Sequence, residues 1–249
     1  WAEWNGADPA LLQKRFQAVG MPGAEQTRWI DPAEVCRTFE LPAGQRFLLY
    51  LPFPAQALKW GWWTHGVYDQ PWPFVATERA VARRVRRWCD LQGLAMVVKY
   101  RDKHPVRPWL ARLADRVIGD EPWEPTCFRL LLSGQAAGLV HHLSTACVDA
   151  AVAGVWADCV APWPPSRIPP YALRLAMDDF RATPDATSFY NWPGLSGAMA
   201  PHQFRDYVKL YGAIDSVDPD ARHRYLERFT GAEPFEAGRR IVEDLEKIV

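Results

Sequence analysis

The sequence has no long apolar run and no excess charge of either sign. No stretch approaches the roughly 20 consecutive apolar residues of a membrane-spanning helix, and the N-terminus lacks the basic patch and apolar core of a secretory signal. Lysine plus arginine equals aspartate plus glutamate, at 29 each, so no overall field attracts nucleic acid. We therefore expect a cytoplasmic chain, either free or peripheral at the inner membrane, that does not bind nucleic acid.

Cysteine pairs and cofactor motifs are also missing. The five cysteines are scattered and never stand in CxxC spacing, which indicates reduced thiols rather than a disulfide framework or a zinc site. No Walker loop, GxGxxG, GxSxG, HExxH or EF-hand pattern occurs. These absences argue against a P-loop kinase or an NAD enzyme, and we expect neither a bound cofactor nor a metal ion.

Apolar residues, tryptophan and proline are abundant. Apolar residues make up 49% of the 249 positions, enough to bury a full core, and the chain holds 13 tryptophans and 22 prolines. The Trp-rich loop at residues 52–73 could stack on sugar rings or simply pack against the core. Because the first residue is Trp1 rather than methionine, we expect a fragment or an excised domain.

Short apolar runs alternate with helical patterns through the middle of the chain. The expected strands are residues 46–51, 94–99, 116–119, 139–142 and 155–160, and the expected helices between them are residues 77–92, 110–115, 127–133 and 145–153. Continuous apolar runs indicate strands that are buried on both faces. The alternation predicts an α/β fold, a doubly wound parallel sheet with right-handed crossovers.

Further helices are expected on both sides of this region, at residues 10–19, 33–39, 201–211, 218–229 and 235–248. We divide the chain into an N-terminal helical segment or interlobe linker (1–44), a Rossmann-like nucleotide-donor-binding domain (45–170) and a C-terminal helical extension that packs on it (171–249).

The most informative stretch is residues 139–154, where an apolar strand breaks at Ser144 into a helix of small residues that Gly154 closes. The first N–H groups of a helix are unpaired and its dipole favours an anion. Ser144 and Thr145 therefore form a candidate phosphate site, although a plain N-cap would explain Ser144 equally well. Asp149 faces the same way as Thr145 on the helix, and it either accepts bonds from a ribose or sugar hydroxyl or is simply exposed.

A second candidate region follows the strand at residues 94–99. It carries the cations Lys99, Arg101 and Lys103 and a His104-Pro105 step. Ligands of open parallel sheets lie beyond the carboxyl ends of the strands, so this loop and the Ser144 turn should face one crevice if their strands are near neighbours. His104 alone could equally be a surface histidine.

Two adjacent histidines, His141 and His142, end the strand before Ser144. Their side chains should point to opposite faces of the sheet and cannot easily share a metal ion. We expect one to enter the core, and the other, His142 by preference, to orient a substrate or act as a base. Four arginines at residues 83, 84, 86 and 87 could bind phosphates, but a solvated helix face explains them better.

The pattern resembles, in order along the chain, the C-terminal donor-binding lobe of GT-B transferases that build bacterial surface polysaccharides. The residues that carry the resemblance are Lys99-Tyr-Arg-Asp-Lys-His104-Pro105, the segment 114–120, and Leu139-Val-His-His-Leu-Ser144-Thr145 with Asp149 and Gly154. Two groups are most similar in pattern: CDP-glycerol glycerophosphotransferase-like proteins, and the sialyl and Kdo transferases that use CMP-sugars.

The resemblance implies a nucleotide-linked donor (CDP, CMP or UDP), a glycan or lipid-linked acceptor, and metal-independent transfer. It places His104 on the donor phosphate, Ser144 and Thr145 as the phosphate-binding pair, and Lys99 or Arg101 as balancing charge. A GT-B enzyme has two lobes and this chain has room for one, so the resemblance also implies a separate N-terminal lobe with the catalytic base. The alternatives are a UDP-sugar 2-epimerase-like enzyme and a non-catalytic scaffold or glycan-binding lobe of a polysaccharide-assembly protein.

Overall fold

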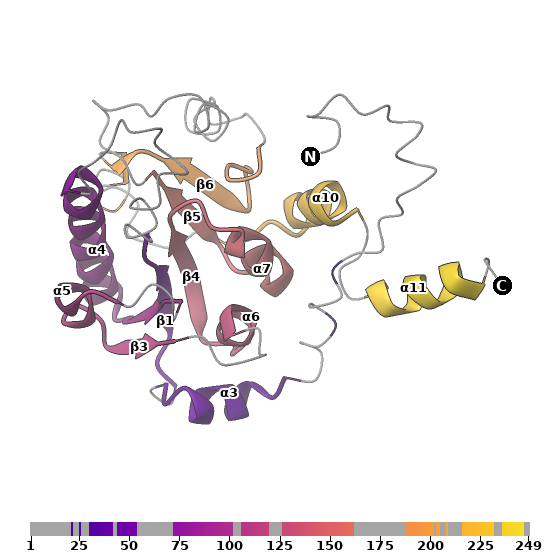
Figure 1. Cartoon of the computed structure of the whole chain (residues 1–249), viewed down its shortest axis with the longest axis horizontal. Helices are drawn as coiled ribbons and strands as arrows, with labels where there is room; N and C mark the ends of the chain where they lie inside the picture. Colours follow the sequence, from indigo (N-terminus) through magenta and orange to yellow (C-terminus); the bar gives the residue numbers. More distant parts are fainter. Residues whose placement is uncertain are drawn as a thin grey trace.

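A six-stranded, all-parallel sheet forms the centre of the molecule (Figure 1). The strands are β1 (Phe47–Leu51), β2 (Ala95–Lys99), β3 (Arg116–Ile118), β4 (Ala136–His141), β5 (Ala157–Val160) and β6 (Ser196–Met199). Their order across the sheet is β3-β2-β1-β4-β5-β6. The structure is a computed structural model and describes residues 21, 25, 30–41, 44–53, 72–101, 106–119, 126–161, 188–201, 203–204, 208, 216–231 and 236–246.

The helices are α3 (Pro32–Thr38), α4 (Trp72–Gln92), α5 (Pro108–Ala111), α6 (Thr126–Leu131), α7 (Ala146–Ala153), α10 (Pro219–Thr230) and α11 (Ala237–Glu246). Asp31 accepts a hydrogen bond from the N–H of Ala33 and so caps α3, and Asp218 caps α10 in the same way through Asp220. Both helices carry proline in their first turn, where its missing N–H costs no hydrogen bond. None of the helices in the described residues is long and apolar enough to cross a membrane.

Helices cover both faces of the sheet, because every central strand is apolar on both sides. Leu49, Val97 and Leu139 pack with α3, α6 and α7. The residues between them in the strands, among them Leu48 and Val140, pack with α4 and α5 on the opposite face. Figure 1 shows α4 on one side of the sheet and α6 and α7 on the other. The sequence-based prediction of a doubly wound α/β sheet is confirmed.

The predicted elements differ from the observed ones in several respects. Strand β4 begins at Ala136, three residues before the expected start at residue 139, and α5 ends at Ala111 rather than at residue 115. Helix α4 begins at Trp72, five residues before the expected start at Thr77, because a proline at position 73 is tolerated in a first turn. Strand β6 was not predicted, since Ser196-Gly-Ala-Met199 has neither an apolar run nor β-branched residues. It pairs with β5 in parallel, so the region 171–249 contributes to the sheet as well as supplying helices. The expected helix at 10–19 lies outside the described residues.

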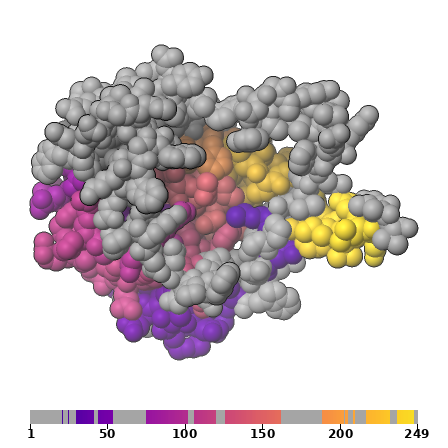
Figure 2. Space-filling model, viewed as in Figure 1, coloured from indigo at the N-terminus to yellow at the C-terminus, as the bar shows by residue number. Residues whose placement is uncertain are grey.

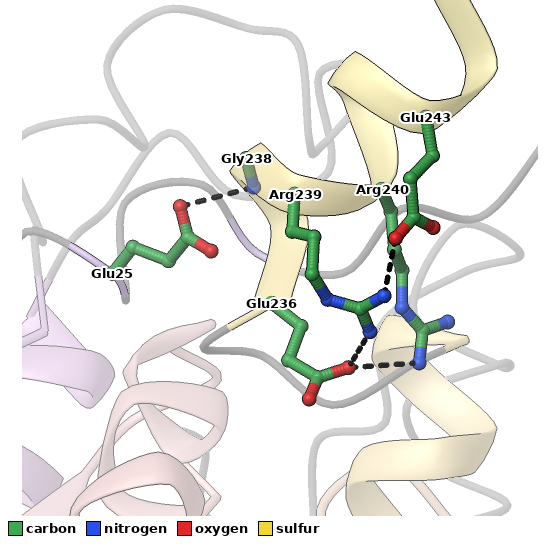
Figure 3. A network of polar contacts seen from close by, with 6 residues as sticks. All are labelled: Glu25, Glu236, Gly238, Arg239, Arg240 and Glu243. Atoms are coloured by element: carbon green, nitrogen blue, oxygen red, sulfur yellow. Dashed lines mark hydrogen bonds and ion pairs between the residues drawn. The ribbon is translucent and has the colours of Figure 1, made fainter.

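Helix α11 extends from the side of the molecule (Figure 2). A carboxylate oxygen of Glu25 accepts a hydrogen bond of 3.0 Å from the N–H of Gly238, which ties the helix start to the N-terminal region. Arg239 bridges Glu236 and Glu243 along the exposed surface (Figure 3). Exposed ion pairs of this kind contribute little stability, so the contact to Glu25 and the burial of Ala237 are what hold this end of α11.

Candidate functional site

The strand order creates one point in the sheet where the chain reverses its direction of travel. From β1 the chain moves outward to β2 and β3 on one side, and then returns to β4 on the other side of β1. The carboxyl ends of β1 and β4 therefore diverge into crossovers on opposite faces. Ligands of doubly wound sheets bind in the crevice at such a switch point. The expected ligand position in this chain is therefore beyond Leu51 and His141, partners in the register of the two strands.

The chain turns sharply into α7 beside this crevice. Leu143 adopts a positive φ of 49°, a conformation that costs a non-glycine residue energy and that the surrounding contacts must enforce. The Ser144 N–H donates to Nδ1 of His141 at 3.1 Å, and the Ser144 hydroxyl accepts from the N–H of Ala146 at 3.2 Å. Ser144 thus fixes the start of α7.

Thr145 is placed differently from Ser144. It is exposed at the N-terminus of α7, and its side chain makes no capping hydrogen bond. Within the part of the chain that the structure describes, neither its N–H nor its hydroxyl has a partner. Two free donors at the positive end of a helix are the arrangement that binds phosphate. The predicted pair is therefore divided in role: Ser144 builds the turn and Thr145 presents the donors.

Lys99 and Asp149 come together although they are fifty residues apart in the sequence. Lys99 ends β2 on the face that α6 and α7 cover, and Asp149 lies in the first turn of α7. Burial raises the pKa of Asp149 to about 6, while a hydrogen bond from Cys127 and the charge of Lys99 oppose the rise. A half-buried carboxyl beside a lysine can accept a hydrogen bond from a ligand hydroxyl.

Of the remaining residues predicted for the basic loop, the structure describes Arg101. Arg101 is exposed just after β2. Lys103, His104 and Pro105 lie outside the described residues. Strand β1 separates β2 from β4, so the two turns are about 10 Å apart at the strand level, at about 4.8 Å per strand. A diphosphate with its sugar can span such a distance, and the parallel arrangement places both turns at one edge of the sheet.

The two histidines point to opposite faces of the sheet, as the strand geometry requires. The His142 ring donates through Nδ1 to the carbonyl of Val160 at 2.7 Å, so its Nε2 accepts from the hydroxyl of Tyr50 at 2.9 Å. Burial lowers the pKa of His142 to about 4. Both ring nitrogens are thus engaged in the core, and the hypothesis that His142 acts as a base finds no free nitrogen here.

His141 is also completely buried, on the α7 side, against the ring of Tyr190. Burial and then the neighbouring His142 lower its pKa to about 3. Its Nδ1 accepts from the N–H of Ser144, which leaves the proton on Nε2, and that atom has no hydrogen-bond partner in the described part of the chain. His141 therefore serves the turn into α7 by orienting Ser144.

One buried acidic residue, on the face of the sheet opposite α7, was missed in the sequence. Glu78 is 1% exposed on α4, and burial raises its pKa to about 7, while Arg107 and the N–H of Phe53 lower it. The spacing of the sequence could have revealed it. Glu78 falls three residues before Val81 and seven before Val85, on the buried stripe of the helix. A carboxyl on an apolar stripe indicates a functional or structural charge.

Two of the four arginines predicted on this helix, Arg84 and Arg86, make contacts within the fold, while Arg83 and Arg87 are exposed. Arg86 pairs with Asp90 and Asp115, and Arg84 donates to the carbonyl of Pro201. These contacts agree with the interpretation of this stretch as a helix surface rather than a phosphate site. Among the described residues, no group of three or more histidine, cysteine, aspartate or glutamate side chains is arranged to hold a metal ion.

No protein-family model and no curated protein matches this sequence. Among solved structures, the chain is similar to a variant of the wall teichoic acid polymerase TagF soaked with CDPG, at 11% identity and a TM-score of 0.48, covering 94% of this chain and 50% of that one. It is also similar to S. aureus MnaA in complex with UDP, at 12% identity and a TM-score of 0.40, covering 92% and 53%. The chain spans about half the length of these proteins. Similarity at this level assigns no activity, and the function must be argued from the site.

Proposed function

We propose that this chain is the donor-binding lobe of a GT-B-type glycosyl- or glycerophosphotransferase that uses a CDP-, CMP- or UDP-linked donor in bacterial surface polysaccharide synthesis. The observation that carries the proposal is Thr145, whose N–H and hydroxyl have no partner among the described residues and stand at the N-terminus of α7 beside the switch point of the sheet. Phosphate is the ligand that such a site favours.

The groups around Thr145 fit the rest of a nucleotide-linked donor. Lys99 supplies a positive charge at the end of β2, and Arg101 follows it. Asp149 supplies an acceptor for a ribose or sugar hydroxyl. In this proposal His104 adds a further contact to the donor phosphate, as the sequence resemblance implies, and charge that develops on the leaving phosphate is balanced by protein cations. The base that activates the acceptor would come from a second lobe.

Isothermal titration with CDP-glycerol, CMP-sialic acid and UDP-N-acetylglucosamine, each with and without EDTA, tests the proposal. We expect one of the three to bind, with an affinity that EDTA leaves unchanged. The substitution Thr145→Val should weaken binding about tenfold through the lost hydroxyl donor, with little change in stability. Ser144→Ala should instead destabilise the chain by about 1 kcal/mol through the lost cap.

Thr38→Val, at an exposed threonine that ends α3, is the matched control and should change neither quantity. Absence of binding by all three compounds would refute the donor site. If wild type binds a donor and Thr145→Val binds it equally well, the phosphate lies elsewhere in the chain. A scaffold that binds glycan alone would respond to oligosaccharide and to none of the nucleotides.

A further inference from the structure

A buried polar cluster lies on the α4 face of the sheet, opposite α7, and the donor site described above does not use it. It consists of Glu78 from α4, Tyr50 from β1, His142 after β4, and Arg107 at the start of α5. Glu78, Tyr50 and His142 are at most 4% exposed. Buried charge is costly unless it is paired, so this carboxyl requires an explanation.

The Glu78 carboxylate reaches two chain segments that leave the sheet. The N–H of Phe53, two residues beyond β1, donates to it. The other oxygen, Oε2, has no hydrogen-bond partner within the described ranges and lies 3.9 Å from Nε of Arg107. Phe53 follows the β1 edge of the switch-point crevice, and Arg107 stands between β2 and β3, three residues after His104.

We propose that Glu78 is a positioning residue whose carboxylate holds Phe53 and Arg107, and so fixes the exits of β1 and β2 around the donor crevice. This inference rests on the proposed function, since the exits matter because a donor binds between them. Glu78 does not touch the donor in this proposal. It acts through the backbone at Phe53 and through the guanidinium of Arg107.

The contacts of Glu78 with Phe53 and Arg107 depend on the charge of its carboxyl group and therefore on pH. An ionised Glu78 attracts Arg107 and is a strong acceptor for Phe53, whereas a protonated Glu78 is a weak acceptor with no attraction for the guanidinium. The other groups that face it are Tyr50 and His142. Burial raises the pKa of Tyr50 well above its ordinary value and lowers that of His142 to about 4, so both stay neutral near pH 7. The pKa of Glu78, about 7, then sets the pH range in which the carboxyl group ionises and these two contacts strengthen.

The decisive experiment is titration of wild type and Glu78→Gln with CDP-glycerol at pH 6, 7 and 8. Both phosphates of this compound are esterified, so the ligand itself does not titrate in this range. Wild-type affinity should rise about fivefold from pH 6 to pH 8, a coupling of ordinary size. Glu78→Gln, which cannot ionise, should bind with the weaker affinity and without this rise. Glu227→Gln, an exposed glutamate on α10, should behave as wild type.

Two further measurements separate this inference from the donor proposal. Arg107→Ala should flatten the same pH profile, while Arg107→Lys should retain part of it. A measurement on the free chain needs no nucleotide: the backbone amide proton of Phe53 should shift downfield in NMR spectra from pH 6 to pH 8 in wild type, because its acceptor becomes charged, and stay constant in Glu78→Gln. Parallel profiles in wild type and Glu78→Gln would overturn the inference even if CDP-glycerol binds well. A wild type that binds no nucleotide would refute the donor site, and with it the role of Glu78 in binding. The shift of the Phe53 amide proton would then decide alone whether Glu78 holds this segment.

Discussion

The hydroxyl of Tyr50 donates a hydrogen bond of 2.9 Å to Nε2 of His142, and this bond joins the carboxyl ends of β1 and β4 inside the core. Nδ1 of the same ring donates to the carbonyl of Val160 at the end of β5. One phenol and one imidazole therefore link three neighbouring strands directly beneath the proposed donor crevice. We therefore expect the geometry at this end of the sheet to depend on these two bonds.

Replacing Tyr50 by phenylalanine should destabilise the chain by about 1–3 kcal/mol, because the buried Nε2 of His142 would lose its donor and water cannot replace it. Urea unfolding followed by circular dichroism measures the change. Tyr100→Phe, at a half-buried tyrosine just after β2, removes the same hydroxyl and should stay within about 0.5 kcal/mol of wild type. Equal effects of the two substitutions would contradict a structural role for the Tyr50 bond.

Glu78 should make stability fall as pH rises through the range between its two pKa values. Its pKa is raised from 4.5 to about 7 in the folded chain, so between these values the folded state holds more protons than the unfolded state. Wild type should lose about 3 kcal/mol from this group as pH rises from about 4.5 to above 7. Because Glu78→Gln lacks the loss, its stability relative to wild type should increase by that amount over the range. A difference that does not vary with pH would show that the carboxyl is not perturbed.

Arg222 on α10 should anchor α10 to α7. Its guanidinium donates to the carbonyls of Ala151 and Val152 at 2.6 and 2.7 Å, in the last turn of α7. We expect Arg222→Ala to destabilise the chain by about 2–3 kcal/mol in thermal or urea unfolding, since hydrogen bonds to a charged group are lost. Arg224→Ala, at an exposed arginine of the same helix, is the control and should have little effect. If both substitutions are harmless, the contact contributes nothing to docking.

Gly194, just before β6, should not tolerate a side chain. Its φ is 85°, and an added Cβ would lie 3.0 Å from the Cβ atoms of both Ala221 and Asp218. Strain and overpacking together predict a loss of about 3 kcal/mol for Gly194→Ala. Gly134→Ala isolates the strain, because Gly134 has a φ of 73° and no atom within 4 Å of an added Cβ, and it should lose about 1 kcal/mol. Losses of equal size would remove the packing contribution.

Much of the fold could be predicted from the sequence because the central strands are buried on both faces. Residues 46–51, 94–99 and 155–160 contain the observed β1, β2 and β5, since a continuous apolar run of strand length has few other stable places. Strand β6 could not be predicted: Ser196-Gly-Ala-Met199 becomes a strand only because β5 offers it an unpaired edge. Pairing with a neighbour, and not local preference, determines such a strand.

The candidate site divides in the same way. The sequence by itself determined that a strand breaks at Ser144 into a small-residue helix, because this follows from local chemistry and from Gly154, which closes α7 at a positive φ. Only the tertiary structure decided that the N–H and hydroxyl of Ser144 are both hydrogen-bonded within the turn, while those of Thr145 have no partner among the described residues. It also decided that both ring nitrogens of His142 are hydrogen-bonded. It also brought Lys99 to Asp149 and placed Glu78 beside Arg107. Those relationships join distant segments, and their partners are fixed by the order of the strands, which the pattern of one sequence does not contain.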